Sequence, residues 1–320
     1  MSIEVLKPGL LTTPQDFGRQ GFTHLGIGRA GAFDAPAYRL ANALAGNARD
    51  ACALEITLLG PTLRFDCDAC IAVTGAPLSV QIDGVEHAMW SPLFIHAGRT
   101  LALAAMRSGC RTYLAVHGGF DFEPVLGSRS LDVNAALGPL QRPLRVGDAL
   151  RIRETGNGSR EMKFNWSIDP RPWFDAESPL RLLPATHTHL LDAESRQALF
   201  SQAFQVSNDS NRVGVRLRGV PLRLDTPVEL ISEACVAGTL QLPPSGEPIA
   251  LGVEHPVSGG YPRIGQIAAV DLPHLAQRRP GDAIRFAPCT LDEARQALRE
   301  RERELREMEM LIATRLQQGA

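Results

Sequence analysis

Short apolar runs recur along the chain, many of them alternating with polar residues, and glycine, proline, asparagine or aspartate separates them. Runs of roughly four to eight residues that are bounded by such turn formers are typical of β-strands. The pattern therefore predicts a mainly β protein. The predicted strands include Ile3–Val5, Leu54–Leu58, Ile71–Thr74, Leu78–Ile82, Leu101–Ala105, Thr112–His117, Val228–Ile231, Ile249–Val253 and Gln266–Val270.

Local signals predict one tight hairpin and three helices. The dipeptide Asp83-Gly84 lies between two apolar runs, and it tolerates the positive φ that both turn positions of a two-residue hairpin need. Asp34 and Asp192 are suited to cap helices, because a carboxylate accepts the free amides of a first turn. Thr290 and Glu293 form a capping box. The predicted helices are 34–46, 192–199 and 291–316.

One short segment is repeated. Arg145–Ile152 contains a Gly-Asp turn that leads into an alternating strand, and it recurs as Arg279–Phe286 with six of eight positions identical or conservative. A looser copy occupies Ala97–Leu103. Because the two close copies each end a β-rich half, we predict two similarly built domains joined by the polar segment Glu154–Pro179. The predicted boundaries are 1–160 and 178–290 for the domains and 291–320 for a C-terminal helix.

Composition excludes several functions. The 320 residues carry 33 basic and 35 acidic side chains, for a net charge of −2, and all the basic residues are arginines except Lys7 and Lys163. A near-neutral chain without a basic stripe lacks the electrostatic footprint of a nucleic-acid-binding protein. Neither lysine lies in a glycine-rich phosphate loop, and their surroundings are unsuited to Schiff-base catalysis.

The sequence indicates a reducing compartment. The N-terminal residues lack the layout of a signal peptide, and no apolar run approaches the roughly 20 residues that cross a bilayer. The six cysteines are scattered over a long chain, which argues against a disulfide framework. We therefore expect a cytoplasmic protein that binds neither membrane nor nucleic acid.

Three motifs suggest a specific function but lack the context for it. Gly26–Gly31 matches G-x-G-x-x-G, yet the residues before it read as a loop rather than a strand, which disfavours a dinucleotide site. Cys67–Cys70 is a lone C-x-x-C and most simply packs near a turn between strands. His187 and His189 would lie on one face of a strand, but no further metal ligand accompanies them. We predict no metal site.

Polar side chains in loops are better candidates for a ligand site, because binding residues concentrate on the loops of a rigid scaffold. The glycine-rich loop that begins with Gln15–Arg19 is one such candidate. Ser128–Ser130 either presents Arg129 to an anion or forms a turn in which this arginine pairs with Asp132. His117 has apolar neighbours and is interpreted as a core or rim residue. Further polar clusters are Ser207–Gly214, Ser232–Glu233, Gly238–Gln241, Ser258–Pro262 and Asp271.

Motifs along nearly the whole chain, from Ile3 to Phe286, follow the order of one known protein family. In the first half they are Ile3–Gly9, Gln15–Arg19, Arg39–Leu44, Leu54–Thr57 and Tyr113–Gly119. In the second half they are Leu126–Ser130, Ser210–Arg212, Ser232–Glu233, Gly238–Pro243, Gly259–Pro262 and Asp271–Pro273. The chain resembles the allophanate hydrolase subunit 2 family, also called the biotin-dependent carboxyltransferase family. KipA, the C subunit of 5-oxoprolinase and the carboxyltransferase domain of urea carboxylase are among its members.

The resemblance implies a fold and partners. The expected fold is two cyclophilin-like β-barrel domains with a few helices and a long C-terminal helix. The expected partner is a protein of the allophanate hydrolase subunit 1, or KipI-like, type, joined in the 5-oxoprolinase type by a third subunit. Such a complex opens 5-oxoproline to glutamate with ATP. Because amide resonance makes the lactam inert, phosphorylation of its carbonyl oxygen is a reasonable route.

Three functions follow from the resemblance. This chain contains no biotin carboxylase or biotin-carrier segment, which favours a subunit of an ATP-dependent amide or lactam hydrolase of the 5-oxoprolinase type, with ATP shared with the partner. One alternative is a biotin-dependent carboxyltransferase acting on urea or a related amide, and another is a KipA-like regulatory binding protein without turnover. Glu254–Ser258 and His187–His189 depart from the family pattern, which keeps the alternatives open.

The family motifs and the chemistry of their side chains together select the candidate site residues. Glu233 and Asp271 are acid/base candidates, and the backbone amides of Gly259 and Gly260 are suited to hold an oxyanion. The candidate catalytic residues are Glu233, Asp271 and Arg212, and the candidate substrate-binding residues are Arg129, Asn211, Gln241, Ser258, Gly259, Gly260 and Tyr261.

Overall fold

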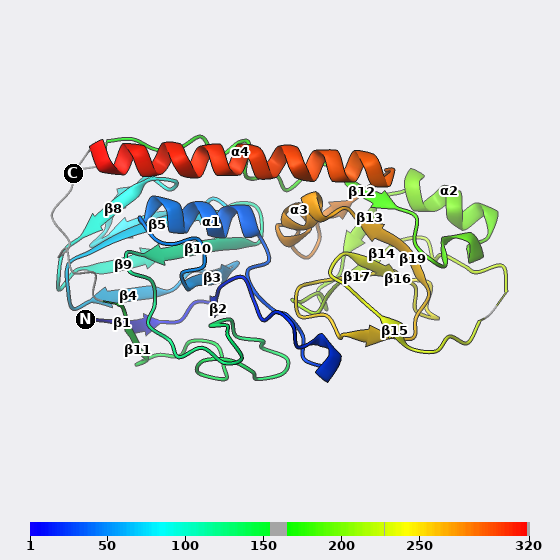
Figure 1. Cartoon of the computed structure of the whole chain (residues 1–320), viewed down its shortest axis with the longest axis horizontal. Helices are drawn as coiled ribbons and strands as arrows, with labels where there is room; N and C mark the ends of the chain where they lie inside the picture. Colours follow the sequence, from blue (N-terminus) through cyan, green and yellow to red (C-terminus); the bar gives the residue numbers. More distant parts are fainter. Residues whose placement is uncertain (154–164, 227, 319–320) are drawn as a thin grey trace. The chain divides into compact units, whose positions relative to one another are not determined.

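The chain forms two compact units in the computed structural model, which describes residues 1–153, 165–226 and 228–318 (Figure 1). The first unit consists of Met1–Arg19, Asp34–Phe174 and Glu304–Ala320, and the second unit consists of Gln20–Phe33 and Asp175–Arg303. Two features of this division are absent from the predicted boundaries: 20–33 belongs to the second unit, and the C-terminal helix contributes to both. Within the predicted linker, 154–164 lies outside the described residues.

Two antiparallel sheets build the first unit. One has six strands in the order β11-β1-β4-β9-β6-β7, and the other has five in the order β2-β3-β10-β5-β8. The strands are β1 Ser2–Lys7, β2 Leu11–Gln15, β3 Ala53–Thr57, β4 Thr62–Phe65, β5 Ala69–Gly75, β6 Val80–Ile82, β7 Val85–His87, β8 Pro92–Ile95, β9 Thr100–Leu103, β10 Arg111–Val116 and β11 Ala149–Arg151.

One apolar core fills the first unit. Side chains from both sheets, such as Ile3 and Leu54, are fully buried in the same hydrophobic cluster. Helix α1 (Ala35–Leu44) packs on β5 and β10, and the Asp34 carboxylate caps it as predicted by accepting the Ala37 amide at 3.1 Å. The sheets thus enclose the core in a barrel-like arrangement, which confirms the predicted fold class.

An eight-stranded sheet in the order β20-β13-β14-β17-β16-β19-β12-β21 builds the second unit, and β15 and β18 form a separate two-stranded ribbon. Leu180, Leu240 and Ile284 are fully buried in its own hydrophobic cluster. The elements are β12 Leu180–Leu183, α2 Ala193–Ser201, β13 Phe204–Val206, β14 Gly214–Arg218, β15 Glu233–Ala234, β16 Thr239–Gln241, β17 Ile249–Leu251, β18 Ser258–Gly259, β19 Arg263–Ile267, α3 Leu272–Ala276, β20 Ala283–Ile284, β21 Phe286–Pro288 and α4 Leu291–Gln318.

The repeated segment forms the same turn in both units. Gly147 and Gly281 adopt φ of 83° and 91°, which glycine tolerates without strain. The Gly147 amide donates to the Val5 carbonyl, and the Val5 amide donates to the carbonyl of the residue after Gly147. Gly281 makes the same pair of hydrogen bonds with Val206. In the looser copy, the Gly98 amide donates to the carbonyl of Phe65 at the end of β4, and the Phe65 amide donates to the Arg99 carbonyl. The repeat is therefore structural as well as sequential.

Two predicted strands differ in the structure. Val228–Ile231 contains no strand, because this apolar run faces no neighbouring strand and Ile231 is 90% exposed. In Gln266–Val270 the strand ends at Ile267, and a short 3-10 turn leads into α3. The hairpin at Asp83-Gly84 joins β6 to β7 with φ of 48° and 84°, as predicted.

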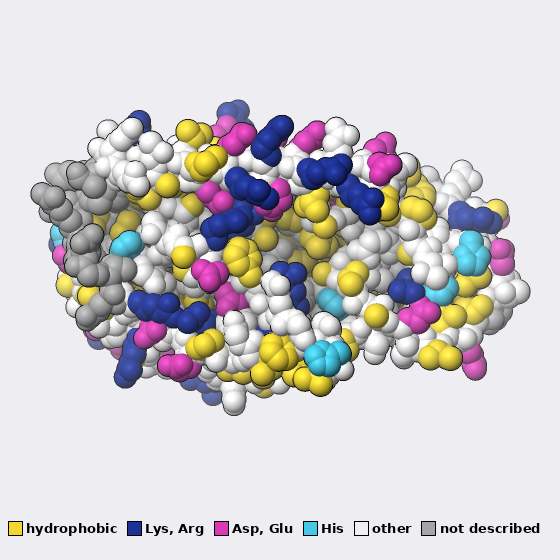
Figure 2. All heavy atoms as spheres, in the orientation of Figure 1, with side chains coloured by type: hydrophobic (Ala, Val, Ile, Leu, Met, Phe, Trp, Pro, Cys, Tyr) yellow, Lys and Arg dark blue, Asp and Glu magenta, His cyan; other side chains and the backbone are white. Residues whose placement is uncertain are grey.

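The predicted capping box starts α4. The amide and hydroxyl of Thr290 both donate to the Glu293 carboxylate at 2.8 Å. Arginine and glutamate side chains cover much of its exposed surface, which appears as dark blue and magenta along the upper edge in Figure 2. Among the helices of the described residues, none is both long enough and apolar enough to span a bilayer.

A buried ion pair attaches the end of α4 to α1 within the first unit. Glu309 of α4 accepts two hydrogen bonds from Arg39 of α1, at 2.8 and 3.0 Å. The exposed fractions of the two side chains are 14% and 4%. Arg49 adds a contact to Glu309 at 3.3 Å. Because the Arg39 guanidinium is almost completely removed from water, the negative charge of Glu309 compensates its positive charge.

We expect Glu309→Ala to lower the free energy of unfolding by about 3 kcal/mol, because it removes the carboxylate that accepts two hydrogen bonds from the buried Arg39 guanidinium. Equilibrium urea denaturation measures this change. The control Glu4→Ala removes the exposed ion pair with Arg64, and should cost less than about 1 kcal/mol. Equal losses in the two variants would contradict a structural role for the Arg39–Glu309 pair.

Candidate functional site

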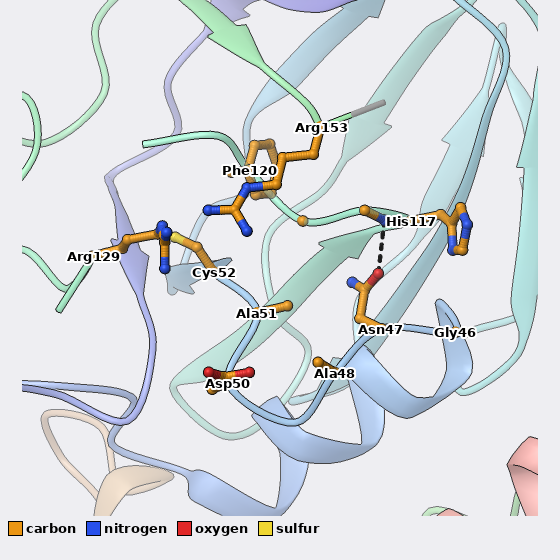
Figure 3. A pocket seen from close by; sticks show the side chains of 12 residues that line it. Gly46, Asn47, Ala48, Asp50, Ala51, Cys52, His117, Phe120, Arg129 and Arg153 are labelled. Atoms are coloured by element: carbon orange, nitrogen blue, oxygen red, sulfur yellow. Dashed lines mark hydrogen bonds between the residues drawn. The ribbon is translucent and has the colours of Figure 1, made fainter. Parts of the chain in front are cut away.

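A small cavity lies beside the end of α1 in the first unit (Figure 3). Its volume is about 200 Å³. Its wall comes from the loop after α1, the turn after β10 and two arginines from later loops. The charged and polar side chains of this wall are Asn47, Asp50, His117, Arg129 and Arg153.

Asn47 holds two walls of the cavity together. The chain leaves α1 through Gly46, whose φ of 70° favours glycine and ends the helix. The Asn47 side-chain amide then donates to the Val116 carbonyl at 2.8 Å and to Asn42 at 3.0 Å. Its oxygen accepts the Gly118 amide at 2.8 Å, which is the dashed line in Figure 3. The loop after α1 is thereby tied to the turn after β10.

Arg129 reaches the cavity because the loop that carries it is fastened to Asp16. The Asp16 carboxylate accepts the hydroxyls of Ser128 and Ser130 at 2.6 Å each and the Arg129 amide at 2.5 Å. It also accepts the Gly18 amide at 2.8 Å. Asp16 is only 6% exposed. Two family motifs that lie more than a hundred residues apart in the sequence therefore fold into one junction.

The other polar residues of the glycine-rich loop complete this junction. Arg19, which is 2% exposed, donates to the carbonyls of Ser130 and Leu137. The Gln15 side-chain amide donates to the Leu131 carbonyl at 2.9 Å. Gln15 and Arg19 thus support the Arg129 loop from behind and do not line the cavity.

The turn in which Arg129 pairs with Asp132 is not formed among the described residues. The Arg129 Nε donates to the Phe122 carbonyl at 2.8 Å, and Asp132 accepts the Ala135 amide at 2.9 Å. The Arg129 side chain therefore makes a different contact from the one that this turn needs, and its role as a ligand anchor stays a prediction.

Two guanidinium groups face the cavity, and a carboxylate lies across from them. Arg153 donates from its Nε to Asp121 at 3.1 Å, and the backbone amide of Arg153 donates to the Gly119 carbonyl at 3.2 Å. In Figure 3 the side chains of Arg129 and Arg153 both extend into the same space, with Asp50 on the opposite side. The cavity therefore offers a positive end and a hydrogen-bond acceptor facing it.

Cys52 and His117 contribute shape rather than a nucleophile. Burial, and then the negative charge of Asp16, raise the pKa of the Cys52 thiol far above its ordinary value, so the thiol stays protonated at neutral pH. His117 Nδ1 lies 2.8 Å from the Ala45 carbonyl, which can only accept, so this nitrogen carries the proton. Its ring lies beyond Asn47 from the arginines in Figure 3, in agreement with a rim position.

Half of the predicted site residues gather in the second unit, around the β15–β18 ribbon. Glu233 pairs with Gly259 across the ribbon, and its carboxylate forms an ion pair with Arg263. Gln241 is buried and donates to the Cys235 sulfur at 3.4 Å. A Cβ at Gly259 would lie 2.5 Å from the Gln241 amide nitrogen, so a larger residue there would displace the end of the Gln241 side chain. The structure thus brings together Glu233, Gln241, Ser258, Gly259 and Gly260.

Arg212 and Asn211 make structural contacts elsewhere in the second unit. Arg212 is 3% exposed, and it donates to the Glu254 carboxylate at 2.5 Å and to the Gly31 carbonyl at 2.7 Å. The Asn211 side chain accepts the amides of Val213 and Gly214 and so forms a tight turn. The catalytic role predicted for Arg212 stays a prediction, but its guanidinium already has two protein partners.

Asp271 and Tyr261 make contacts with other residues than those of the ribbon cluster. Asp271 is fully buried and accepts the Arg181 amide at 2.7 Å. Tyr261 is 46% exposed and lines a second cavity of about 190 Å³, together with Arg216 and Arg218. Their chemical roles also stay predictions.

No group of three or more potential metal ligands occurs among the described residues. The predicted strand that would carry His187 and His189 is wrong, because Thr188–Leu190 forms a 3-10 turn. His187 is buried and its Nδ1 accepts the Arg263 amide, whereas His189 is exposed. Burial raises the pKa of Cys67 to about 11 and that of Cys70 to about 12, so neither is a ready thiolate. Cys67 lies in the turn between β4 and β5 and Cys70 lies at the start of β5, near this turn as predicted.

Residues 25–288 match the protein family described as carboxyltransferase domain, subdomain A and B. The chain belongs to this family. The resemblance found in the motifs is thereby confirmed.

Curated relatives of this carboxyltransferase-domain chain fall into two kinds. The C subunit of 5-oxoprolinase from Escherichia coli is 39% identical over 304 residues, which cover 94% of this chain and 96% of that protein. The protein of the same name from Haemophilus influenzae is 35% identical, with 94% and 95% covered. Urea amidolyase of Saccharomyces cerevisiae is 30% identical, and the match covers 92% of this chain but 17% of that protein.

Solved structures share the fold of this carboxyltransferase-domain chain. The urea amidolyase of Kluyveromyces lactis aligns with a TM-score of 0.87 at 28% identity, over 95% of this chain and 20% of that one. The protein TTHA0988 aligns with a TM-score of 0.79 at 35% identity, over 89% of this chain and 55% of that one. The chain therefore spans only part of the solved chains that it matches.

Three polar cavity residues were not predicted from the sequence. Asn47 and Asp50 follow the end of a predicted helix, and a polar cluster at that point is a signal for a binding loop. Arg153 follows directly after the repeated segment Arg145–Ile152, so its placement depends on how that strand pairs.

We expect Asp16→Asn to lower the free energy of unfolding by about 2 kcal/mol. An amide offers one acceptor oxygen where the carboxylate offers two, and its NH2 group would face the Arg129 amide. Urea denaturation measures the loss. Asp209→Asn is the control, because that carboxylate is 71% exposed, and its removal should change the free energy by no more than about 0.5 kcal/mol. A stability of Asp16→Asn equal to that of the control would show that the junction is not held by this charge.

Proposed function

We propose that this chain is a C-type subunit of an ATP-dependent lactam hydrolase, and that it takes part in opening 5-oxoproline to glutamate only together with partner subunits. The observation that carries the proposal is the end-to-end match with two proteins, each named as the C subunit of 5-oxoprolinase, at 39% and 35% identity. By contrast, the urea amidolyases extend far beyond the matched region.

The cavity of the first unit supports a direct role in binding a small polar ligand. Arg129 is held by its own backbone amide, its Nε and the two flanking serines before any ligand arrives. Such preorganisation reduces the side-chain entropy that binding would otherwise cost. A volume of about 200 Å³ suits a small amide rather than a nucleotide.

Two features of the described residues favour our assignment of ATP to the partner. Gly26–Gly31 follows a 3-10 turn rather than a strand. The Asp34 carboxylate occupies the first turn of α1, where a negative charge repels a phosphate that would otherwise be attracted to a helix N-terminus. The partner is of the KipI-like type, and the complex also includes a third subunit.

A second candidate function is the transfer of CO2 from carboxybiotin to urea or a related amide. The structural likeness to the urea amidolyase of Kluyveromyces lactis over 95% of this chain favours it. A KipA-like regulatory role rests on the altered segment Glu254–Ser258. That support is weakened by the structure, because Glu254 is 5% exposed and pairs with Arg212.

Reconstitution with the KipI-like partner and the third subunit separates these functions. We expect phosphate release from ATP that depends on 5-oxoproline and is matched by glutamate formation, and no carboxylation of urea by carboxybiotin. Arg129→Ala should lower kcat/KM by at least about tenfold, because one charged hydrogen bond to the substrate is lost.

The control for this assay is Arg151→Ala, which removes an exposed arginine that does not line the cavity. It should leave kcat/KM unchanged. Carboxylation of urea would favour the second function, and a stable complex that turns over none of these substrates would favour regulation.

A further inference from the structure

The terminal nitrogens of two arginines are directed at the cavity of the first unit. Arg129 and Arg153 each use the Nε for a protein contact, with the Phe122 carbonyl and the Asp121 carboxylate respectively. Within residues 1–153, 165–226 and 228–318, no hydrogen bond engages their terminal nitrogens. Both side chains extend into the cavity in Figure 3. The two planar guanidinium groups thus present four terminal nitrogens to the cavity.

These forks are placed by different parts of the fold. The Arg129 backbone is fixed by Asp16. The Arg153 backbone amide donates to the Gly119 carbonyl, at the turn that follows β10. Asp121 then orients the Arg153 side chain from outside the cavity. Convergence of two independently held guanidinium groups on one small space is the geometry that a carboxylate or a phosphate needs.

Asp50 on the opposite wall decides between these anions. A phosphate dianion would face this carboxylate across a cavity of only about 200 Å³, with unfavourable like-charge repulsion. A ligand with one carboxylate and a separate N–H donor satisfies both walls, because Asp50 can accept the N–H. A neutral amide such as urea brings no anionic oxygen to the terminal nitrogens of these guanidinium groups, which Asp121 contacts only through the Arg153 Nε.

We propose that this cavity selects small amides that carry a carboxylate group, with Arg129 and Arg153 binding the carboxylate and Asp50 accepting the amide N–H. The inference deepens the proposed function, and it rests on that function only for the identity of the substrate. It makes Arg153 and Asp50 specificity-determining residues and Asp121 a positioning residue.

Isothermal titration of the full chain, and of the reconstituted complex, tests this selection. The probes are 5-oxoproline, 2-pyrrolidinone (the same lactam ring without the carboxylate), urea and inorganic phosphate. We expect 5-oxoproline to bind at least about 30-fold more tightly than each of the others, because two charged hydrogen-bonded contacts are made only with its carboxylate.

The variants separate recognition of the carboxylate from general damage. Arg153→Ala should weaken 5-oxoproline by about tenfold and leave the weak binding of 2-pyrrolidinone unchanged. Asp50→Ala should weaken both lactams by a similar factor of about five, since both carry the ring N–H. The matched control Arg151→Ala removes the same charge two residues away from Arg153 and should change neither affinity.

Several results would overturn the inference. They are equal loss of both lactams in Arg153→Ala, weakening by Arg151→Ala as large as by Arg153→Ala, phosphate binding as tight as 5-oxoproline, or no saturable binding to either the chain or the complex. Failure of the proposed function has a different signature. In that case the complex does not hydrolyse 5-oxoproline, while the carboxylate-dependent binding and its loss in Arg153→Ala persist.

Discussion

The candidate site depends on one buried carboxylate. Asp16 gathers the hydroxyls of Ser128 and Ser130 and the amide of Arg129, and each hydrogen bond to a charged acceptor contributes roughly 1.5–3 kcal/mol. Without that charge the loop would keep its contacts with Gln15, Arg19 and Phe122 but would hold Arg129 less firmly at the cavity. The glycine-rich loop near the start therefore serves the site indirectly, as the anchor of a distant loop.

The scaffold explains how the second arginine arrives at the same place. The turn at Gly147 forms two backbone hydrogen bonds with Val5 and leads into β11, which pairs with β1. Arg153 lies two residues beyond the end of this strand, and its amide donates to the carbonyl of Gly119 beyond β10. The same Gly-Asp turn recurs in the second unit at Gly281. The Gly-Asp turn that is common to both units thus also helps to place the Arg153 side chain in the first unit.

Local signals in the sequence predicted local structure well. Asp34, Thr290 with Glu293, and Asp83-Gly84 each act within a few residues, so their helices and hairpin could be read directly. Val228–Ile231 failed because an apolar run becomes a strand only where a neighbour pairs with it.

The site itself could be predicted only in part. Arg129 was identified from a family motif, whereas Arg153 is placed by the long-range pairing of β11 with β1. Asp50 lies in the loop after α1, and the polar residues around it do not by themselves show which distant arginines it faces. Arg212 was selected from a family motif as a catalytic residue, but the structure places it in a buried ion pair. The same residue type serves as a ligand anchor or as half of a buried ion pair, and its partner Glu254 became evident only from the fold. The most direct test of the account is a crystal structure of the full chain with 5-oxoproline. We predict the ligand carboxylate within hydrogen-bond distance of Arg129 and Arg153, with its N–H towards Asp50. Ordered ligand at the β15–β18 ribbon, with the first-unit cavity holding only water, would contradict it.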